Sequence, residues 1–157
     1  MSSLAAALIL CCSSAWGKDL QGRAGVGFAS GLDDVQSLTV RYGLPIGEAP
    51  MNILVELGAG ASLTGGTADQ WTVGLRGLYA VVVEDNLNLY AALGVAYVNR
   101  SGSHTFRVQP ALSAEWFAFG LENLGLSASW GLAVDFGSGV DFATFGGVPG
   151  VGLNYYF

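Results

Sequence analysis

The side chains that could support catalysis are few in this sequence. The single histidine, His104, directly follows Ser103 in a turn-rich stretch, and the acidic residues Glu115 and Asp135 come later in the chain. A histidine that acts as general base on a serine, oriented by an acidic residue, would make a hydrolase. Adjacent residues on a strand point to opposite faces, so Ser103 and His104 are badly placed to cooperate. We therefore expect His104 to be a polar residue of an outer loop, and we assign no catalytic residue.

Charged side chains recur on one face of the predicted strands. They are Arg23, Arg41, Glu56, Arg76, Arg107, Glu115 and Asp135. Four guanidinium groups against three carboxylates leave a net charge of only +1, and a guanidinium fork binds a carboxylate at two points. Paired carboxylates also occur in glycosidases, but nothing in the pattern predicts a substrate cleft. The sequence therefore favours a salt-bridged network that fills an interior.

The cysteine and histidine content of the sequence gives little support to a metal site, a cofactor or a disulfide. Both cysteines, Cys11 and Cys12, lie in an amino-terminal segment whose apolar run and small residues before Lys18 resemble a signal peptide. We expect cleavage before Lys18, which leaves a cysteine-free domain of residues 18–157; lipidation of Cys11 is an alternative that the bulky Leu10 disfavours. One histidine and no mature cysteine predict no metal site and no cofactor.

The elements that must position the charged residues are strands. Eight segments place apolar residues at every second position, with small or polar residues between them, as in Leu38, Val40 and Tyr42 against Thr39 and Arg41. The first segment puts Leu20, with Ala24, Val26 and Phe28, on the apolar face. The segments cover residues 20–28, 38–44, 53–60, 71–81, 87–97, 106–116, 126–136 and 145–157.

The composition decides which face points outward. Hydrophobic residues make up 52% of the chain and charged residues 11%, too few charges to coat a soluble sandwich. Polar residues interrupt every apolar run after residue 17, so no helix could span a bilayer. A closed antiparallel barrel in lipid resolves this, because its apolar face points outward and its polar face lines the lumen. The net charge of −6 also disfavours a nucleic-acid partner.

The carboxyl terminus carries the most specific motif. Val151, Leu153, Tyr155 and Phe157 alternate and end on an aromatic residue, and aromatic residues gather toward both ends of the predicted strands, as interfacial belts require. In these features the chain resembles the small outer-membrane barrels, the class of the OmpA transmembrane domain and OmpX. The resemblance implies an all-β, eight-stranded antiparallel up-and-down transmembrane β-barrel in the outer membrane of a Gram-negative-type bacterium. It also implies that these four residues are an insertion signal for the barrel-assembly machinery, and that lipopolysaccharide surrounds the barrel.

The connections at the outer end are short in the sequence, at residues 30–36, 63–69, 99–104 and 137–141. Short loops disfavour an adhesin or a receptor. We therefore predict a monomeric barrel with a structural role and a plugged lumen. Two alternatives stay open. One is a lipid-modifying hydrolase that uses His104, similar to the outer-membrane lipid A deacylases, although their His-x-Ser pair is absent here; the other is a narrow pore.

Overall fold

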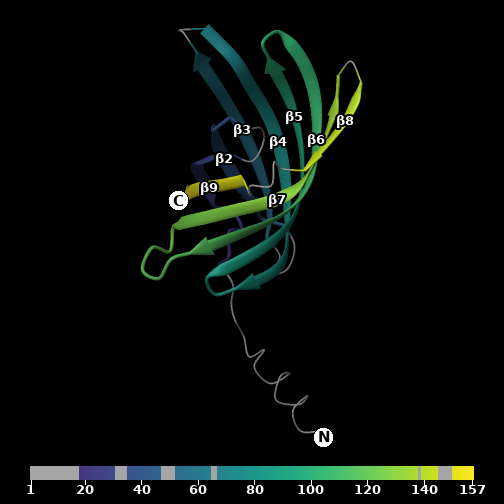
Figure 1. Ribbon diagram of the computed structural model, residues 1–157. Helices are drawn as coiled ribbons and strands as arrows, with labels where there is room; N and C mark the ends of the chain where they lie inside the picture. The colour runs from purple at the N-terminus through teal and green to yellow at the C-terminus, as the bar shows by residue number, and fades with distance from the viewer. Residues whose placement is uncertain (1–17, 31–34, 47–51, 65–66, 138, 145–149) are drawn as a thin grey trace, which may run out of the picture.

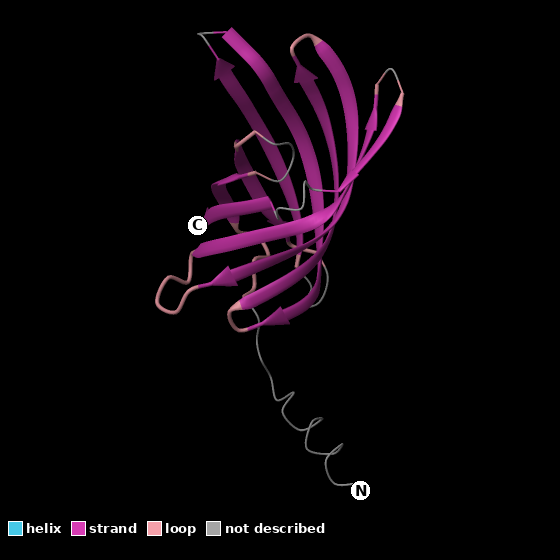
Figure 2. Cartoon of the chain, in the orientation of Figure 1, coloured by secondary structure: helices cyan, strands magenta, loops and turns pink. Residues whose placement is uncertain are grey.

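The chain folds into antiparallel strands that curve around a common axis (Figures 1 and 2). The computed structural model describes residues 18–30, 35–46, 52–64, 67–137, 139–144 and 150–157, so the predicted leader lies outside the described residues. Among these residues no helix is long and apolar enough to cross a membrane. The strands are β1 (Ala24–Ala29), β2 (Ser37–Leu44), β3 (Ile53–Thr64), β4 (Thr67–Glu84), β5 (Leu87–Arg100), β6 (Ser103–Phe117), β7 (Leu124–Phe136), β8 (Val140–Thr144) and β9 (Gly150–Tyr156).

The sheet closes on itself. Each strand from β1 to β7 pairs with the next, β9 pairs with both β7 and β1, and β8 pairs with the far part of β7. Strands β8 and β9 therefore share the eighth position of the barrel, although the sequence predicted one continuous segment there. Residues 145–149, which include the predicted outward Phe145, lie outside the described part of the chain. The predicted eight-stranded antiparallel up-and-down barrel is confirmed.

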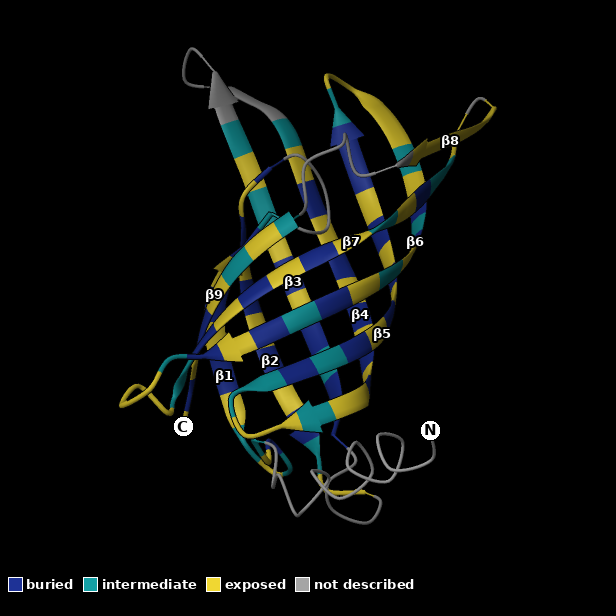
Figure 3. Ribbon diagram, turned by 60° about the horizontal axis from the view of Figure 1, so that its bottom comes forward, coloured by how far each residue is buried: buried dark blue, intermediate teal, exposed yellow. Residues whose placement is uncertain are grey.

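Burial alternates along nearly every strand, as two-residue side-chain periodicity requires (Figure 3). In β2, Ser37, Thr39 and Arg41 are buried, whereas the intervening Leu38 and Val40 are 55% and 48% exposed. The polar residues therefore point into the barrel and the apolar residues point out. This inversion of an ordinary soluble protein is the pattern predicted from the composition.

The strands at one end of the barrel are longer than predicted. We call this the distal end; it carries the β3–β4, β5–β6 and β7–β8 connections. The expected loop at residues 99–104 shrinks to the turn residues Ser101 and Gly102, with φ of 49° and 86°, the positive values that a two-residue hairpin turn of type I′ needs. Most of the expected loop at residues 63–69 likewise belongs to β3 and β4. Polar residues of both expected loops thus join the ladder.

The opposite, proximal end holds a cluster of buried apolar side chains and carries Lys18 and the β4–β5 and β6–β7 turns. Leu20, Leu54, Leu78 and Phe117 are each at most 1% exposed and belong to one cluster, which we call the apolar floor. The prediction that Leu20 lies on the outer face is wrong. The chain turns before β1, with Gly22 at φ +70°, and this turn carries Leu20 inside.

Candidate functional site

An ion-pair cluster crosses the interior of the barrel above the apolar floor. Arg41, Glu56 and Arg76 stand directly opposite one another on β2, β3 and β4. Arg41 Nε donates to Glu56 Oε2 at 2.5 Å, and Arg76 Nη1 lies 3.5 Å from Glu56 Oε1. None of the three side chains is more than 2% exposed. Directly opposed residues on antiparallel strands are close enough to pair, so the register builds this row.

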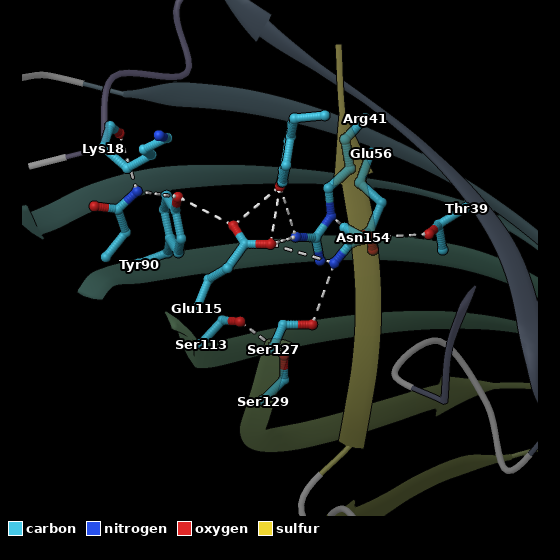
Figure 4. A network of polar contacts seen from close by, with 12 residues as sticks. Lys18, Thr39, Arg41, Glu56, Tyr90, Ser113, Glu115, Ser127, Ser129 and Asn154 are labelled. Carbon is cyan, nitrogen blue, oxygen red and sulfur yellow. Dashed lines mark hydrogen bonds and ion pairs between the residues drawn. The ribbon is translucent and has the colours of Figure 1, made fainter. Parts of the chain in front are cut away.

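Glu115 joins the row from β6, on the other side of the lumen (Figure 4). Its carboxylate accepts a hydrogen bond from Arg41 Nη1 at 2.8 Å and from the Tyr156 hydroxyl at 2.9 and 3.0 Å. Tyr90 and the Asn154 amide donate to it at 3.4 and 3.3 Å. The carboxylate is thus held by strands on several sides of the bore, and it ties them together.

Glycine makes room for this carboxylate. A Cβ atom at Gly125, on the neighbouring strand β7, would lie 2.6 Å from Glu115 Oε1. That approach is closer than any side chain tolerates without movement. The inward glycines therefore allow long polar side chains to fill the bore of an eight-stranded barrel, which is just wide enough for side chains to fill it.

The cluster is neutral as a whole. Two guanidinium groups, Arg41 and Arg76, face two carboxylates, Glu56 and Glu115. Buried charges are tolerated when each has a partner and further hydrogen bonds, while removal of one partner is strongly destabilising. We call these four residues, together with Tyr90, Tyr156 and Asn154, the lumen cluster. Its chemistry is that of a cross-brace between strands.

The structure divides the seven residues of the predicted charge network into three groups. Four belong to the lumen cluster. Arg107 and Asp135 form a separate two-point pair, opposite each other on β6 and β7, with N–O distances of 2.5 and 2.6 Å. Arg23 lies at the proximal rim, where it donates to Asn123 Oδ1 at 2.6 Å and to the Phe157 carbonyl.

Several polar residues of the interior were missing from the predicted site. Asn154 and Asn88 fall on the inward face of the predicted strands, but alternation gives only a face and no partner. Asn52 precedes β3 and belongs to no predicted segment, although it is 1% exposed and binds the chain before β1. No signal in the sequence distinguishes it from a turn residue.

The predicted insertion signal lies on the outer face. Val151, Leu153, Tyr155 and Phe157 are 43–67% exposed, and the rings of Tyr155 and Phe157 meet edge to face with centroids 5.4 Å apart. Strand β9, which carries the first three, closes the barrel against β1. A role in assembly remains a prediction.

Within the described residues, His104 has no serine or carboxylate partner. Its Nδ1 lies 2.9 Å from the Asn99 amide nitrogen, and its ring stacks on Tyr97 with centroids 5.7 Å apart. Glu115 lies eleven residues further along β6, or about 36 Å at the rise of a strand. The Asp135 carboxylate is engaged by Arg107. Within the described residues no group of three or more His, Cys, Asp or Glu side chains could hold a metal ion.

A closed barrel with an apolar exterior and a polar interior has the fold of the small outer-membrane barrels. The N-terminal β-barrel domain of Pseudomonas aeruginosa OprF is similar to this chain with a TM-score of 0.60 and 15% identity, over 87% of this chain and 98% of that domain. Neisserial surface protein A (NspA) aligns over 86% of this chain and 94% of its own, at 14% identity and a TM-score of 0.37. No protein-family model and no protein of curated function matches the sequence. The likeness to the OprF domain establishes the fold.

Proposed function

We propose that this protein is an integral β-barrel of the bacterial outer membrane with a structural, non-catalytic role and a closed lumen. The observation that carries this proposal is the lumen cluster, which braces strands from opposite sides of the barrel inside an apolar exterior. We orient the barrel in the membrane with its proximal end toward the periplasm. The protein acts as a monomer without a cofactor, contacts outer-membrane lipid and lipopolysaccharide, and reaches the membrane through the barrel-assembly machinery.

Aromatic side chains support the location in a bilayer. Tyr97, Phe106 and Phe136 stand opposite one another on β5, β6 and β7 toward the distal end, and all are 40–47% exposed. Trp116 and Tyr155 are exposed toward the proximal end. Aromatic residues prefer the two membrane–water interfaces. A hydrocarbon layer between these two levels would cover the exposed leucine and valine side chains.

We expect the mature chain to be recovered with outer membranes, with an amino terminus that begins Lys18-Asp19-Leu20. A barrel closed by backbone hydrogen bonds resists detergent until heated, so unheated and boiled samples should migrate differently in SDS gels. Membrane fractionation, amino-terminal sequencing and gel migration measure these outcomes. Recovery as a soluble periplasmic protein would refute the proposed location.

The closed lumen predicts that the purified protein gives no steady conductance in a planar lipid bilayer. We expect the lumen cluster and the apolar floor to block the axis, because several of their side chains are almost fully buried. Single-channel recording measures this directly, and protein-free detergent serves as the control. Large, stable currents from the native protein would instead favour the narrow pore.

The hydrolase alternative makes a different prediction for His104→Ala. We expect the lipid A profile of cells that carry this variant to equal that of cells with the native protein, because the histidine contacts Asn99 and Tyr97 rather than a serine and a carboxylate. Mass spectrometry of lipid A, with gene-deleted cells as the reference, measures the outcome. An acyl pattern that depends on the gene and is lost in His104→Ala would establish the hydrolase.

A further inference from the structure

The proximal mouth of the barrel holds residues 18–20 in the manner of a bound peptide. The Asn52 amide donates from Nδ2 to the Lys18 carbonyl at 2.8 Å, and its Oδ1 accepts from the Leu20 N–H at 3.0 Å. A second amide, Asn88 Nδ2, donates to the same Lys18 carbonyl at 3.2 Å. Asn52 thus satisfies one carbonyl and one N–H of the segment, as the backbone of a neighbouring strand would.

These two asparagines are built into the barrel. Asn52 is 1% exposed and Asn88 is fully buried. Nδ2 of Asn88 also donates to the Tyr90 hydroxyl at 3.0 Å, and Tyr90 in turn contacts Glu115 in the lumen cluster. The site for the segment is therefore continuous with the cross-brace of the barrel.

The site recognises one side chain of the segment by its apolar shape. Leu20 is fully buried in the apolar floor, in the same cluster as Leu54, Leu78 and Phe117. The preceding Asp19 is exposed. Hydrogen bonds to the backbone of the segment and an apolar hole for one of its side chains are both components of peptide recognition.

The barrel wall leaves space for the segment to pass. A Cβ atom at Gly43 on β2 would lie 1.8 Å from the Leu20 carbonyl oxygen, so any other residue there would collide with the segment. Gly22 N–H donates to the Gly43 carbonyl at 2.8 Å, which fixes the turn that leads into β1. At the other end of the segment, Lys18 Nζ lies 3.1 Å from the Glu122 carboxylate.

We propose that the proximal mouth is a binding site for a short peptide, and that residues 18–20 of the chain are its resident ligand. The site takes a segment with a free carbonyl at one residue and, two residues later, a free N–H and a leucine-sized side chain. Most of its contacts are to backbone, so a peptide from another source with the same leucine fits equally. This inference goes beyond the structural role proposed above and does not rest on the location in a membrane.

The resident segment outcompetes a free peptide as long as it stays intact. Only three residues separate Leu20 from β1, and so short a tether gives an effective concentration in the millimolar range. A free peptide should therefore bind measurably only when the chain's own leucine is prevented from seating.

The first experiment asks whether the segment is seated. In a background with Cys11 and Cys12 changed to serine, Leu20→Cys in the detergent-purified protein should react with a water-soluble maleimide about tenfold or more slowly than Asp19→Cys, because reaction requires opening of the mouth. Adding Asn52→Ala to Leu20→Cys should bring its rate near that of Asp19→Cys. Equal rates in the two single variants would overturn the proposal.

The second experiment asks whether the mouth binds a peptide in trans. The Leu20→Asp variant should bind a dye-labelled peptide Lys-Asp-Leu-Gln-Gly, measured by fluorescence anisotropy, because a charged side chain cannot enter the apolar floor. The native protein, and Leu20→Asp combined with Asn52→Ala, should bind it at least about tenfold more weakly. A control peptide with aspartate in place of leucine should not bind.

The outcomes of the second experiment separate a site from nonspecific adsorption. Equal binding of both peptides to Leu20→Asp, or no binding of either, would overturn the peptide site and would leave the closed structural barrel intact. If Leu20→Asp does not fold, as judged by migration of the unheated sample, Leu20→Ser replaces it with the same expected outcomes. Steady currents from the native protein would contradict the structural role without affecting the peptide site.

Discussion

Glu115→Ala is expected to destabilise the barrel by about 3–5 kcal/mol, the cost of removing one partner from a buried ion pair. The substitution leaves a net positive charge among Arg41, Glu56 and Arg76 and removes the acceptor of two tyrosine hydroxyls. Urea unfolding in detergent micelles, followed by tryptophan fluorescence, measures the free energy of unfolding. Glu122→Ala is the matched control, because that side chain is 81% exposed in its pair with Lys18 and should change stability by at most about 1 kcal/mol.

A double-mutant cycle tests whether charge imbalance, and not the lost volume, causes this effect. Arg41→Ala and Glu115→Ala each unbalance the cluster, whereas the double variant leaves the neutral pair of Glu56 and Arg76. The double variant should therefore be less destabilised than the sum of the two single variants, by an interaction energy on the order of 1–3 kcal/mol. Simple additivity would show that Arg41 and Glu115 do not act through each other.

The row of Arg41, Glu56 and Arg76 shows how much of the interior is predictable from sequence. Two-residue periodicity places each of the three on the inward face, and consecutive strands of an up-and-down barrel are neighbours. Opposite charges at similar heights on adjacent strands then pair. Local pattern and chain order are sufficient for this part of the site, as they are for the eight-stranded barrel itself.

The contact of Glu115 with Arg41 cannot be predicted from the sequence pattern. This contact crosses the lumen between β6 and β2, and whether two such residues lie at the same height depends on the stagger of the strands around the whole barrel. That stagger is a sum of all the registers, and no single segment encodes it. The same uncertainty in height explains why Arg23 lies at the proximal rim, outside the lumen cluster.

Leu20 illustrates a different limit. It keeps the two-residue spacing of the apolar face of β1, so periodicity alone assigns it to the exterior. The backbone leaves the strand at Gly22, with φ +70°, and the spacing before that turn no longer reports a face. The hydrogen bonds that hold the segment before the turn come from Asn52 and Asn88, which are far away in sequence.

The outer face of the barrel is where introducing a single charged side chain should cost the most stability. Only the loss of a charge from the lumen cluster should cost more. Leu75 is 44% exposed on β4, midway between the outward aromatic residues Trp71 and Tyr79, so in the proposed orientation it lies near the middle of the bilayer. Leu75→Arg should destabilise the folded barrel in lipid vesicles by about 2–4 kcal/mol, because the guanidinium group must leave water for hydrocarbon.

The depth of the substitution is what this prediction tests. Val140 is 56% exposed in the distal hairpin of β7 and β8, opposite Phe136, and arginine there can reach water, so Val140→Arg should cost at most about 1 kcal/mol. Unfolding in vesicles by guanidinium chloride measures both variants. The difference between them should shrink in small detergent micelles, where water lies closer to the middle of the strand. Equal tolerance of arginine at Leu75 and Val140 in vesicles would mean that no hydrocarbon layer covers the middle of β4, and the outer-membrane proposal would then fail.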